Sequence, residues 1–92
     1  MPENDIRHED GVFFIERDGR RIAELDYRMS GEAAHVFHTW VDPKLRGGGE
    51  ARRLVQAVVE WARKENRKIV PACSYVRAVF SRSREFDDVR GS

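Results

Sequence analysis

The chain has only one cysteine, no long apolar run and no N-terminal pattern typical of a signal peptide. Each of these features argues against one class of protein: disulfide-bonded, membrane-spanning or secreted. With Cys73 alone, no disulfide can form within the chain, which indicates a reducing, cytoplasmic setting. No apolar run approaches the roughly 20 residues of a membrane-spanning helix. The polar, acidic start, Met1 to Asp5, does not predict a signal peptide. We therefore expect a cytoplasmic protein without a membrane span.

The composition and length of the chain indicate one small globular domain. The 92 residues are 40% hydrophobic and 36% charged, a balance typical of folded rather than disordered chains. This length suits a single core. We expect a flexible, polar lead-in over residues 1–10 and one domain over residues 11–90.

The net charge of +1 conceals an uneven distribution. Residues 1–42 carry 5 basic and 10 acidic side chains, whereas residues 43–84 carry 11 basic and 3 acidic ones. The basic half suits a polyanionic small ligand or nucleic acid, although most of its cations also fit a solvated helix surface. Because the cations are spread around the helix without interleaved aromatic residues, nucleic acid is the weaker interpretation.

Three antiparallel strands are predicted before the basic half. Residues 12–15 form a strand that leads to the hairpin turn Asp18-Gly19. Residues 21–29 alternate buried and polar positions, and residues 33–41 form the third strand. Strict alternation along the third strand places two sets of side chains on opposite faces: Val36, His38 and Trp40 on one, and Phe37, Thr39 and Val41 on the other.

Three glycines, Gly47 to Gly49, join this strand to a helix predicted over residues 49–65. A strand, a glycine loop and a helix N-terminus together aim backbone N–H groups at an anion. Arg46 adds a guanidinium suited to phosphate. A plain flexible connection explains the glycines about equally well. The spacing fits neither the dinucleotide pattern G-x-G-x-x-G nor a Walker loop, because no Gly-Lys-Ser/Thr follows.

A short strand over residues 68–73 follows the helix, and Asn66 is a suitable left-handed residue at the helix end. The intervening helix favours parallel pairing of this strand with the third one. Ser74 can cap a last helix over residues 75–83. The predicted fold class is α+β, with a three-stranded antiparallel meander, a crossover helix, a fourth, parallel strand and a short C-terminal helix.

The glycine loop also fits the pattern Arg-x-x-Gly-x-Ala, here Arg46, Gly49 and Ala51. The pair His38-Thr39 precedes the loop, and a Pro-x-Cys, Pro71 to Cys73, follows the helix. In this order the motifs resemble the very short, single-domain members of the GNAT superfamily of acetyl-CoA-dependent N-acetyltransferases. The resemblance implies a minimal GNAT-like fold, in which the fourth strand splays from the third and acetyl-CoA lies between them.

The resemblance also implies which residues hold the cofactor. The pantetheine arm would pair with the backbone of Trp40 and Val41. The diphosphate would lie on the backbone N–H groups of the loop, contributed by Arg46, Gly47, Gly48, Gly49, Glu50 and Ala51. Two features depart from the family pattern. Glu50 is a carboxylate where a neutral residue is usual, and the two helices that build the acceptor site in full-length members are missing.

Acetyl transfer to an amine needs a base, donors for the oxyanion and an acid for the leaving thiolate. We expect His38 as the base, Cys73 as nucleophile or acid, and Tyr75 as an acid near the thiol. Each has a structural alternative: a packed histidine, a cysteine acting as a small hydrophobe, and a half-buried aromatic ring. No His, Cys and carboxylate cluster has metal-ligand spacing, so no metal is expected.

The leading hypothesis is an acetyl-CoA-binding N-acetyltransferase that acts on an unidentified amine, carried by a small molecule or a protein. The alternative is a CoA-binding or protein-interaction module with the same fold and no turnover. Both a monomer and a homodimer are open, since an unpaired sheet edge and a small size suit a dimer.

Overall fold

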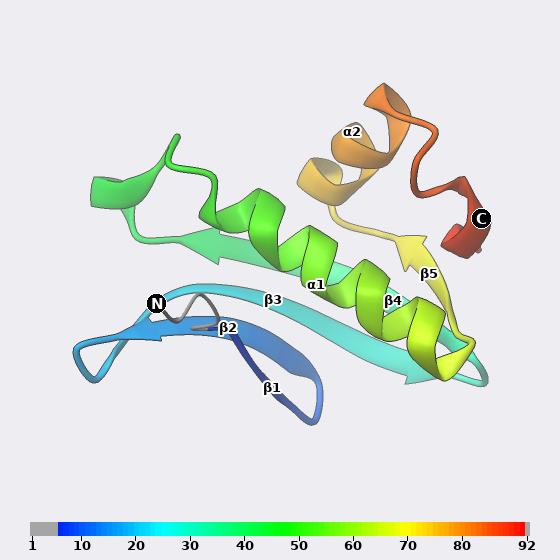
Figure 1. Cartoon of the computed structure of the whole chain (residues 1–92), viewed down its shortest axis with the longest axis horizontal. Coiled ribbons are helices and arrows are strands. Elements are labelled where there is room, and N and C mark those ends of the chain that lie inside the picture. Colours follow the sequence, from blue (N-terminus) through cyan, green and yellow to red (C-terminus); the bar gives the residue numbers. More distant parts are fainter. Residues whose placement is uncertain (1–5, 92) are drawn as a thin grey trace.

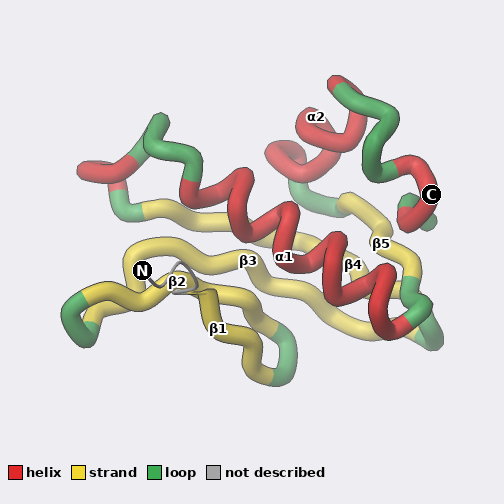
Figure 2. Tube along the Cα trace, in the orientation of Figure 1, coloured by secondary structure: helices red, strands yellow, loops and turns green. Residues whose placement is uncertain are grey.

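The computed structural model describes residues 6–91, which form a five-stranded sheet with two helices (Figures 1 and 2). The strands lie in chain order: β1 (Ile6–Glu9), β2 (Val12–Arg17), β3 (Arg20–Ser30), β4 (Ala33–Val41) and β5 (Lys68–Pro71). Helix α1 (Glu50–Glu65) connects β4 to β5, and α2 (Ser74–Arg82) follows β5. The predicted α+β class is confirmed.

Strand β1 lies in the segment predicted to be a flexible lead-in, residues 1–10. Residues 1–5 of that segment fall outside the described residues, but Ile6–Glu9 pair antiparallel with β2. The chain reverses at Gly11, whose φ of 88° lies in the left-handed region that suits glycine. The meander therefore has four antiparallel strands rather than three. A four-residue strand with one apolar residue shows no periodicity, so only its pairing reveals it.

His8 holds β1 against the aromatic part of the core. Its ring stacks on Phe13 with centroids 3.9 Å apart, its Nε2 is hydrogen-bonded to the Tyr27 hydroxyl, and Trp61 packs edge-on to it. Burial among these rings lowers the pKa of His8, and this effect exceeds the opposing influence of the Asp10 carboxylate. The docked strand therefore favours the neutral imidazole.

We expect this docking to weaken in acid. Because the pKa of His8 is depressed on folding below its ordinary value of 6.5, the unfolded chain binds more protons. The stabilisation is then present above pH 6.5 and is lost as the pH falls through the folded pKa. In chemical denaturation, the denaturant concentration at the unfolding midpoint should decrease as the pH is lowered from about 7.5 to about 5. His8→Phe, which keeps the ring stack, should reduce that dependence, and an identical pH dependence in both proteins would contradict the assignment.

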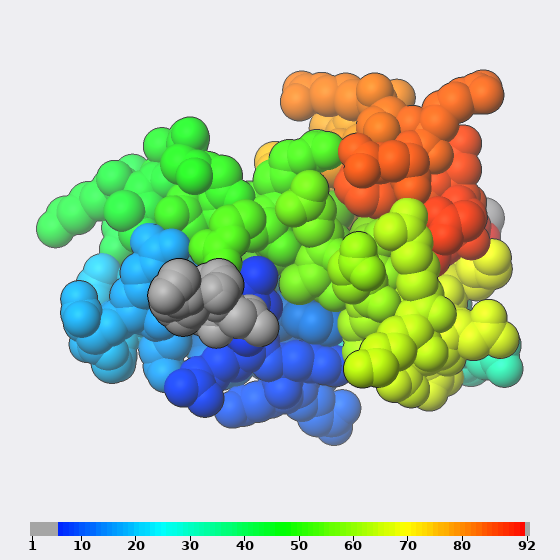
Figure 3. All heavy atoms as spheres, in the orientation of Figure 1, coloured from blue at the N-terminus to red at the C-terminus, as the bar shows by residue number. Residues whose placement is uncertain are grey.

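The core lies between the sheet and the two helices. Helix α1 buries a stripe of apolar residues at helical spacing, each at most 1% exposed: Leu54, Val55, Val58, Val59 and Ala62. Helix α2 adds Val76, Val79 and Phe80 to the same buried cluster, so both helices cover one face of the sheet. The C-terminal segment packs along α1 (Figure 3), where Arg63 Nε donates to Asp88 Oδ2 at 2.9 Å.

The helix ends follow local chemistry closely. Gly49 precedes α1 with φ 93°, and Asn66 ends it with φ 57°, the left-handed conformation expected for that residue. Helix α2 begins one residue earlier than predicted, so Cys73, rather than Ser74, occupies its N-cap position. No helix within residues 6–91 is long and apolar enough to cross a membrane.

Strands β4 and β5 pair in parallel over only part of β4. The pairing runs from Ala33 opposite Lys68 to Val36 opposite Pro71. Ala72 N–H then donates to the Val36 carbonyl at 2.9 Å, and β5 has ended. Within the described chain, residues 37–41 of β4 consequently have no strand partner on the β5 side. This unpaired stretch leads directly to the glycine loop.

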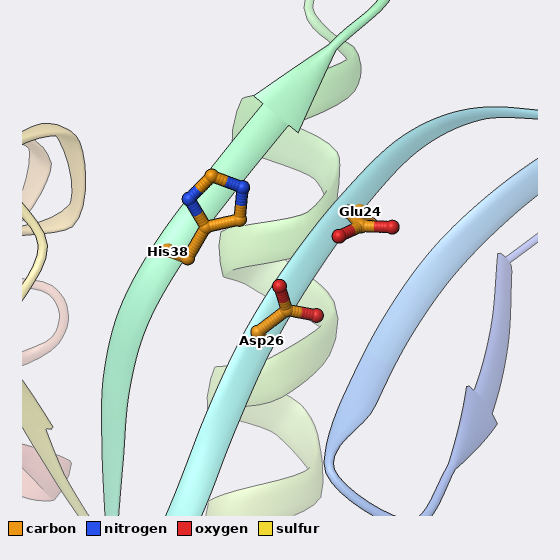
Figure 4. Close-up of side chains that lie close together, drawn as sticks. All are labelled: Glu24, Asp26 and His38. Atoms are coloured by element: carbon orange, nitrogen blue, oxygen red, sulfur yellow. The ribbon is translucent and has the colours of Figure 1, made fainter.

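A bulge in β4 changes which side chains share a face. The register against β3 shifts between His38 and Val36, so Phe37 is the extra residue. The prediction that Val36, His38 and Trp40 share one face is therefore wrong. Val36 is buried in the core, whereas His38 is exposed and lies opposite Asp26 on the face away from α1 (Figure 4).

Candidate functional site

The glycine loop has a backbone conformation set by a preceding turn and by two glycines with positive φ. A short 3-10 turn (Pro43–Leu45) follows β4. The backbone N–H of Lys44 in this turn donates a hydrogen bond to Asp42 Oδ1 at 3.0 Å. Gly47 and Gly49 have φ values of 88° and 93°, which residues with a side chain rarely adopt. No side chain caps the N-terminus of α1, so the N–H groups of its first turn are available to an anion.

A groove of about 560 Å³ lies where β4, the glycine loop and the helices meet. It is lined by the end of β4, the loop, the first turn of α1 and one residue of α2: Thr39, Trp40, Val41, Leu45, Arg46, Gly47, Gly49, Glu50, Ala51, Arg52 and Tyr75. Every residue predicted to hold the cofactor lies in this lining except Gly48. The structure therefore gathers two segments, the strand end and the loop, around one space.

Glu50 points into the protein beneath the loop instead of into solvent. Its side chain is 10% exposed and its Oε2 lies 3.5 Å from Arg17 Nη1. Its Oε1 has no hydrogen-bond partner among the described residues. A Cβ placed on Gly48 would lie 2.7 Å from this Oε1, so the loop backbone closes directly over the carboxylate. The carboxylate is thus balanced on one side by Arg17.

Two ion pairs tie the loop to the β2–β3 hairpin. Arg17 at the end of β2 reaches Glu50, and Arg20 at the start of β3 reaches Asp42 at 2.8 Å. Asp42 and Glu50 are the residues that flank the loop on either side. Each pair joins an exposed arginine to a largely buried carboxylate. Together the two pairs fix both ends of the loop against the sheet. This role of Arg17 and Arg20 was not predicted from the sequence, because it depends on contacts between distant segments.

Cys73 lies at the N-terminus of α2, beside the unpaired stretch of β4. Its Sγ is 3.5 Å from Thr39 Oγ1, and its side chain is half-buried. Burial raises the pKa of the Cys73 thiol, but hydrogen bonds from the Val76 and Tyr75 backbone and from Thr39 outweigh it, so the pKa is lowered. Donors that stabilise a thiolate make this sulfur suited to nucleophilic chemistry.

The three predicted catalytic residues lie on two sides of β4. Tyr75 is 36% exposed and lines the groove near the start of α2. Thr39, and not its neighbour His38, contacts the Cys73 thiol. His38 instead lies on the opposite face of the sheet, where Figure 4 shows it beside two carboxylates. Because side chains alternate along β4, the adjacent residues His38 and Thr39 lie on opposite faces.

The group around His38 was not recognised in the sequence. Glu24, Asp26 and His38 each offer a ligand atom within 4.8 Å of the others, although no metal cluster was expected. The alternation in β3 places Glu24 and Asp26 on one face, but the partner strand's register is needed to add His38. Burial raises the pKa of Asp26, and the neighbouring Glu24 carboxyl raises it further.

Comparison with known proteins gives consistent matches. The family model of GCN5-related N-acetyl-transferase matches residues 12–89. An uncharacterized N-acetyltransferase of Methanocaldococcus jannaschii is 32% identical over 74 residues, which cover 70% of this chain and 31% of that protein. The chain thus spans about a third of that curated relative's length.

Two solved structures share the fold. A GCN5-like protein of Staphylococcus aureus, 30% identical, superposes with a TM-score of 0.80 over 100% of this chain and 92% of its own. The ribosomal-protein-S18-alanine N-acetyltransferase of Escherichia coli, 20% identical, has a TM-score of 0.60 and covers 68% of this chain and 42% of its own. The first similarity spans both chains almost completely, whereas the second concerns the fold alone.

Proposed function

The chain belongs to the GCN5-related N-acetyltransferase family, and from this premise we propose that it transfers the acetyl group of acetyl-CoA to an amine. One observation carries the proposal. The groove joins a helix N-terminus that no side chain caps, the unpaired stretch of β4 and the start of α2, at which the Cys73 thiol lies. A diphosphate, a pantetheine amide and a thioester need these three features in this order.

The proposed pose follows from unsatisfied backbone groups. The diphosphate lies on the N–H groups of the first turn of α1 and on those of Gly47 and Gly49, with the Arg46 guanidinium adding charge. The N–H groups of Arg46 and Gly48 donate instead to carbonyls of the preceding turn. The pantetheine amides pair with the unpaired edge of β4 at Trp40 and Val41, as an added strand would. This places the thioester toward Thr39 and Cys73.

Cys73 is the proposed nucleophile. Its thiolate attacks the acetyl carbonyl carbon, a new C–S bond forms, and the bond to the coenzyme sulfur breaks, so that the coenzyme leaves as a thiolate. Tyr75, which lines the groove, is the proposed acid that protonates that thiolate. The acetyl group on Cys73 then passes to the acceptor amine. We place this activity in the cytoplasm, where a lone cysteine stays reduced.

An amide NMR titration of the labelled protein with acetyl-CoA tests the pose. We expect shifts at Trp40, Val41 and residues 46–52, because these backbone groups would contact the coenzyme. Arg46→Ala should raise the dissociation constant about tenfold, the effect of one hydrogen bond to a charged group. Lys44→Ala removes an equal charge from a residue outside the groove lining and should leave affinity unchanged. Shifts confined to other surfaces would reject the proposal.

A further inference from the structure

The β2–β3 hairpin places two arginines directly opposite each other. Arg17, the last residue of β2, is the register partner of Arg20, the first residue of β3. The turn between them is tight, because Asp18 and Gly19 have φ values of 52° and 76°, as a two-residue hairpin turn requires. Like charges that face each other across a hairpin are destabilising. The two guanidinium groups are therefore stabilised by anions from outside the hairpin.

The anions come from the two ends of the glycine loop, which lies at the same end of the molecule as the β2–β3 turn (Figure 1). Arg17 Nη1 lies 3.5 Å from Glu50 Oε2, and Arg20 Nη2 donates to Asp42 Oδ2 at 2.8 Å. The two carboxylate side chains are sheltered, at 10% and 14% exposure. Glu50 lines the groove, whereas Arg17 is absent from the lining. An effect of Arg17 on a ligand in the groove would therefore act through Glu50.

Glu50 is the part of the loop region that most needs a neighbouring cation. It is the first residue of α1, where backbone N–H groups are proposed to hold the diphosphate. Its carboxylate lies beneath Gly48, and its Oε1 has no hydrogen-bond partner within residues 6–91. A carboxylate whose charge is not compensated would repel a diphosphate at this helix end and would itself interact with the positive end of the helix dipole. Arg17 supplies the compensating charge.

We propose that Arg17 is a positioning residue for diphosphate binding: it compensates the charge of Glu50 and holds this carboxylate beneath the loop, so that the N–H groups at the start of α1 remain available to the ligand. The inference rests on the proposed coenzyme pose. Arg20 and Asp42 hold the other end of the loop through the same hairpin. The ligand class that depends on Arg17 is a diphosphate ester, whereas the binding of a pantetheine arm along β4 does not depend on it.

Calorimetric titration with three probes tests this assignment. Arg17→Ala should raise the dissociation constants of acetyl-CoA and of inorganic pyrophosphate about tenfold, because it leaves a sheltered carboxylate without its cation. S-acetylpantetheine has no diphosphate, so its weaker binding should not change. A merely structural loss that deforms the groove would weaken all three ligands and would contradict the proposal. Arg7→Ala is the matched control, since Arg7 pairs with Glu16 and neither residue lines the groove.

A rescue experiment assigns the effect to the charge of Glu50. Glu50→Gln removes that charge, so this variant should bind pyrophosphate at least as tightly as the wild type, and adding Arg17→Ala should then cost little affinity. Weaker binding in Glu50→Gln alone, or an equal loss from Arg17→Ala with and without Glu50→Gln, would overturn the proposal. The conservative variant Arg17→Lys should retain most of the affinity.

The pyrophosphate arm separates this inference from the proposed function. A wild-type protein that binds pyrophosphate but not acetyl-CoA would reject the coenzyme pose, and the Arg17 variants would still decide whether the hairpin supports an anion site. A wild-type protein that binds neither probe would refute both proposals.

Discussion

Cys73→Ala is expected to lower acetyl transfer by at least about 100-fold while acetyl-CoA still binds. The thiol lies at the start of α2 with hydrogen-bond donors around it, and alanine removes the nucleophile without adding bulk. The position is only half-buried, so the fold should tolerate the smaller side chain. Steady-state turnover with a panel of cationic amines, together with an acetyl-CoA titration, measures both quantities. Full turnover in Cys73→Ala would exclude a covalent role.

Thr39→Val is the companion variant, because it removes a hydroxyl and keeps a similar shape. The Thr39 hydroxyl is 3.5 Å from the sulfur and contributes to the lowered pKa of Cys73. Its loss should raise the thiol pKa and move the acidic limb of the rate profile to higher pH.

Intact-mass measurement after incubation with acetyl-CoA alone should detect one acetyl group on wild type and none on Cys73→Ala. A protein that turns over without ever carrying the acetyl group would instead use direct transfer.

The parts of the fold that the sequence predicts are those encoded by local chemistry. The apolar stripe of α1 is visible in its 3.6-residue spacing, and Asn66 marks the helix end because few other residues adopt positive φ. The glycines of the loop indicate a backbone with positive φ, which other residues rarely adopt. The same locality explains why almost every predicted cofactor residue lines the groove: they form two short, contiguous runs.

The features that the sequence did not predict depend on pairing between distant segments. β1 is too short and polar to show a period, and it is ordered by β2 and by the aromatic contacts of His8. The bulge at Phe37 breaks the strict alternation of β4, so the faces of His38 and Thr39 could not be assigned by counting. Glu50 stands out in the sequence as an unusual carboxylate in the loop, but its partner Arg17 lies on another strand and could not be identified from the sequence.

Gly48→Ala is expected to weaken acetyl-CoA binding by about 10- to 100-fold, the equivalent of one hydrogen bond to a charged group. A Cβ at this position would lie 2.7 Å from Glu50 Oε1 and 3.2 Å from the Leu45 carbonyl oxygen. The first distance is far inside van der Waals contact, and the Glu50 side chain that it meets is only 10% exposed and is ion-paired with Arg17. We expect the loop backbone to shift as well as the carboxylate, which displaces the N–H groups proposed to hold the diphosphate.

The cause can be isolated with Glu50→Ala, because this change removes the atom that the new methyl group would meet. If the collision with the carboxylate displaces the loop, Gly48→Ala should cost much less affinity in the Glu50→Ala background than in the wild type. The loss of binding free energy in the double variant should then be smaller than the sum of the two single losses. Calorimetric titration of the four proteins with acetyl-CoA completes the cycle. Gly47→Ala serves as a contrast, since its Cβ would enter open space and its cost would come only from a φ of 88°. Wild-type affinity in Gly48→Ala would contradict the expected loop movement, because the Glu50 side chain would then have moved in its place.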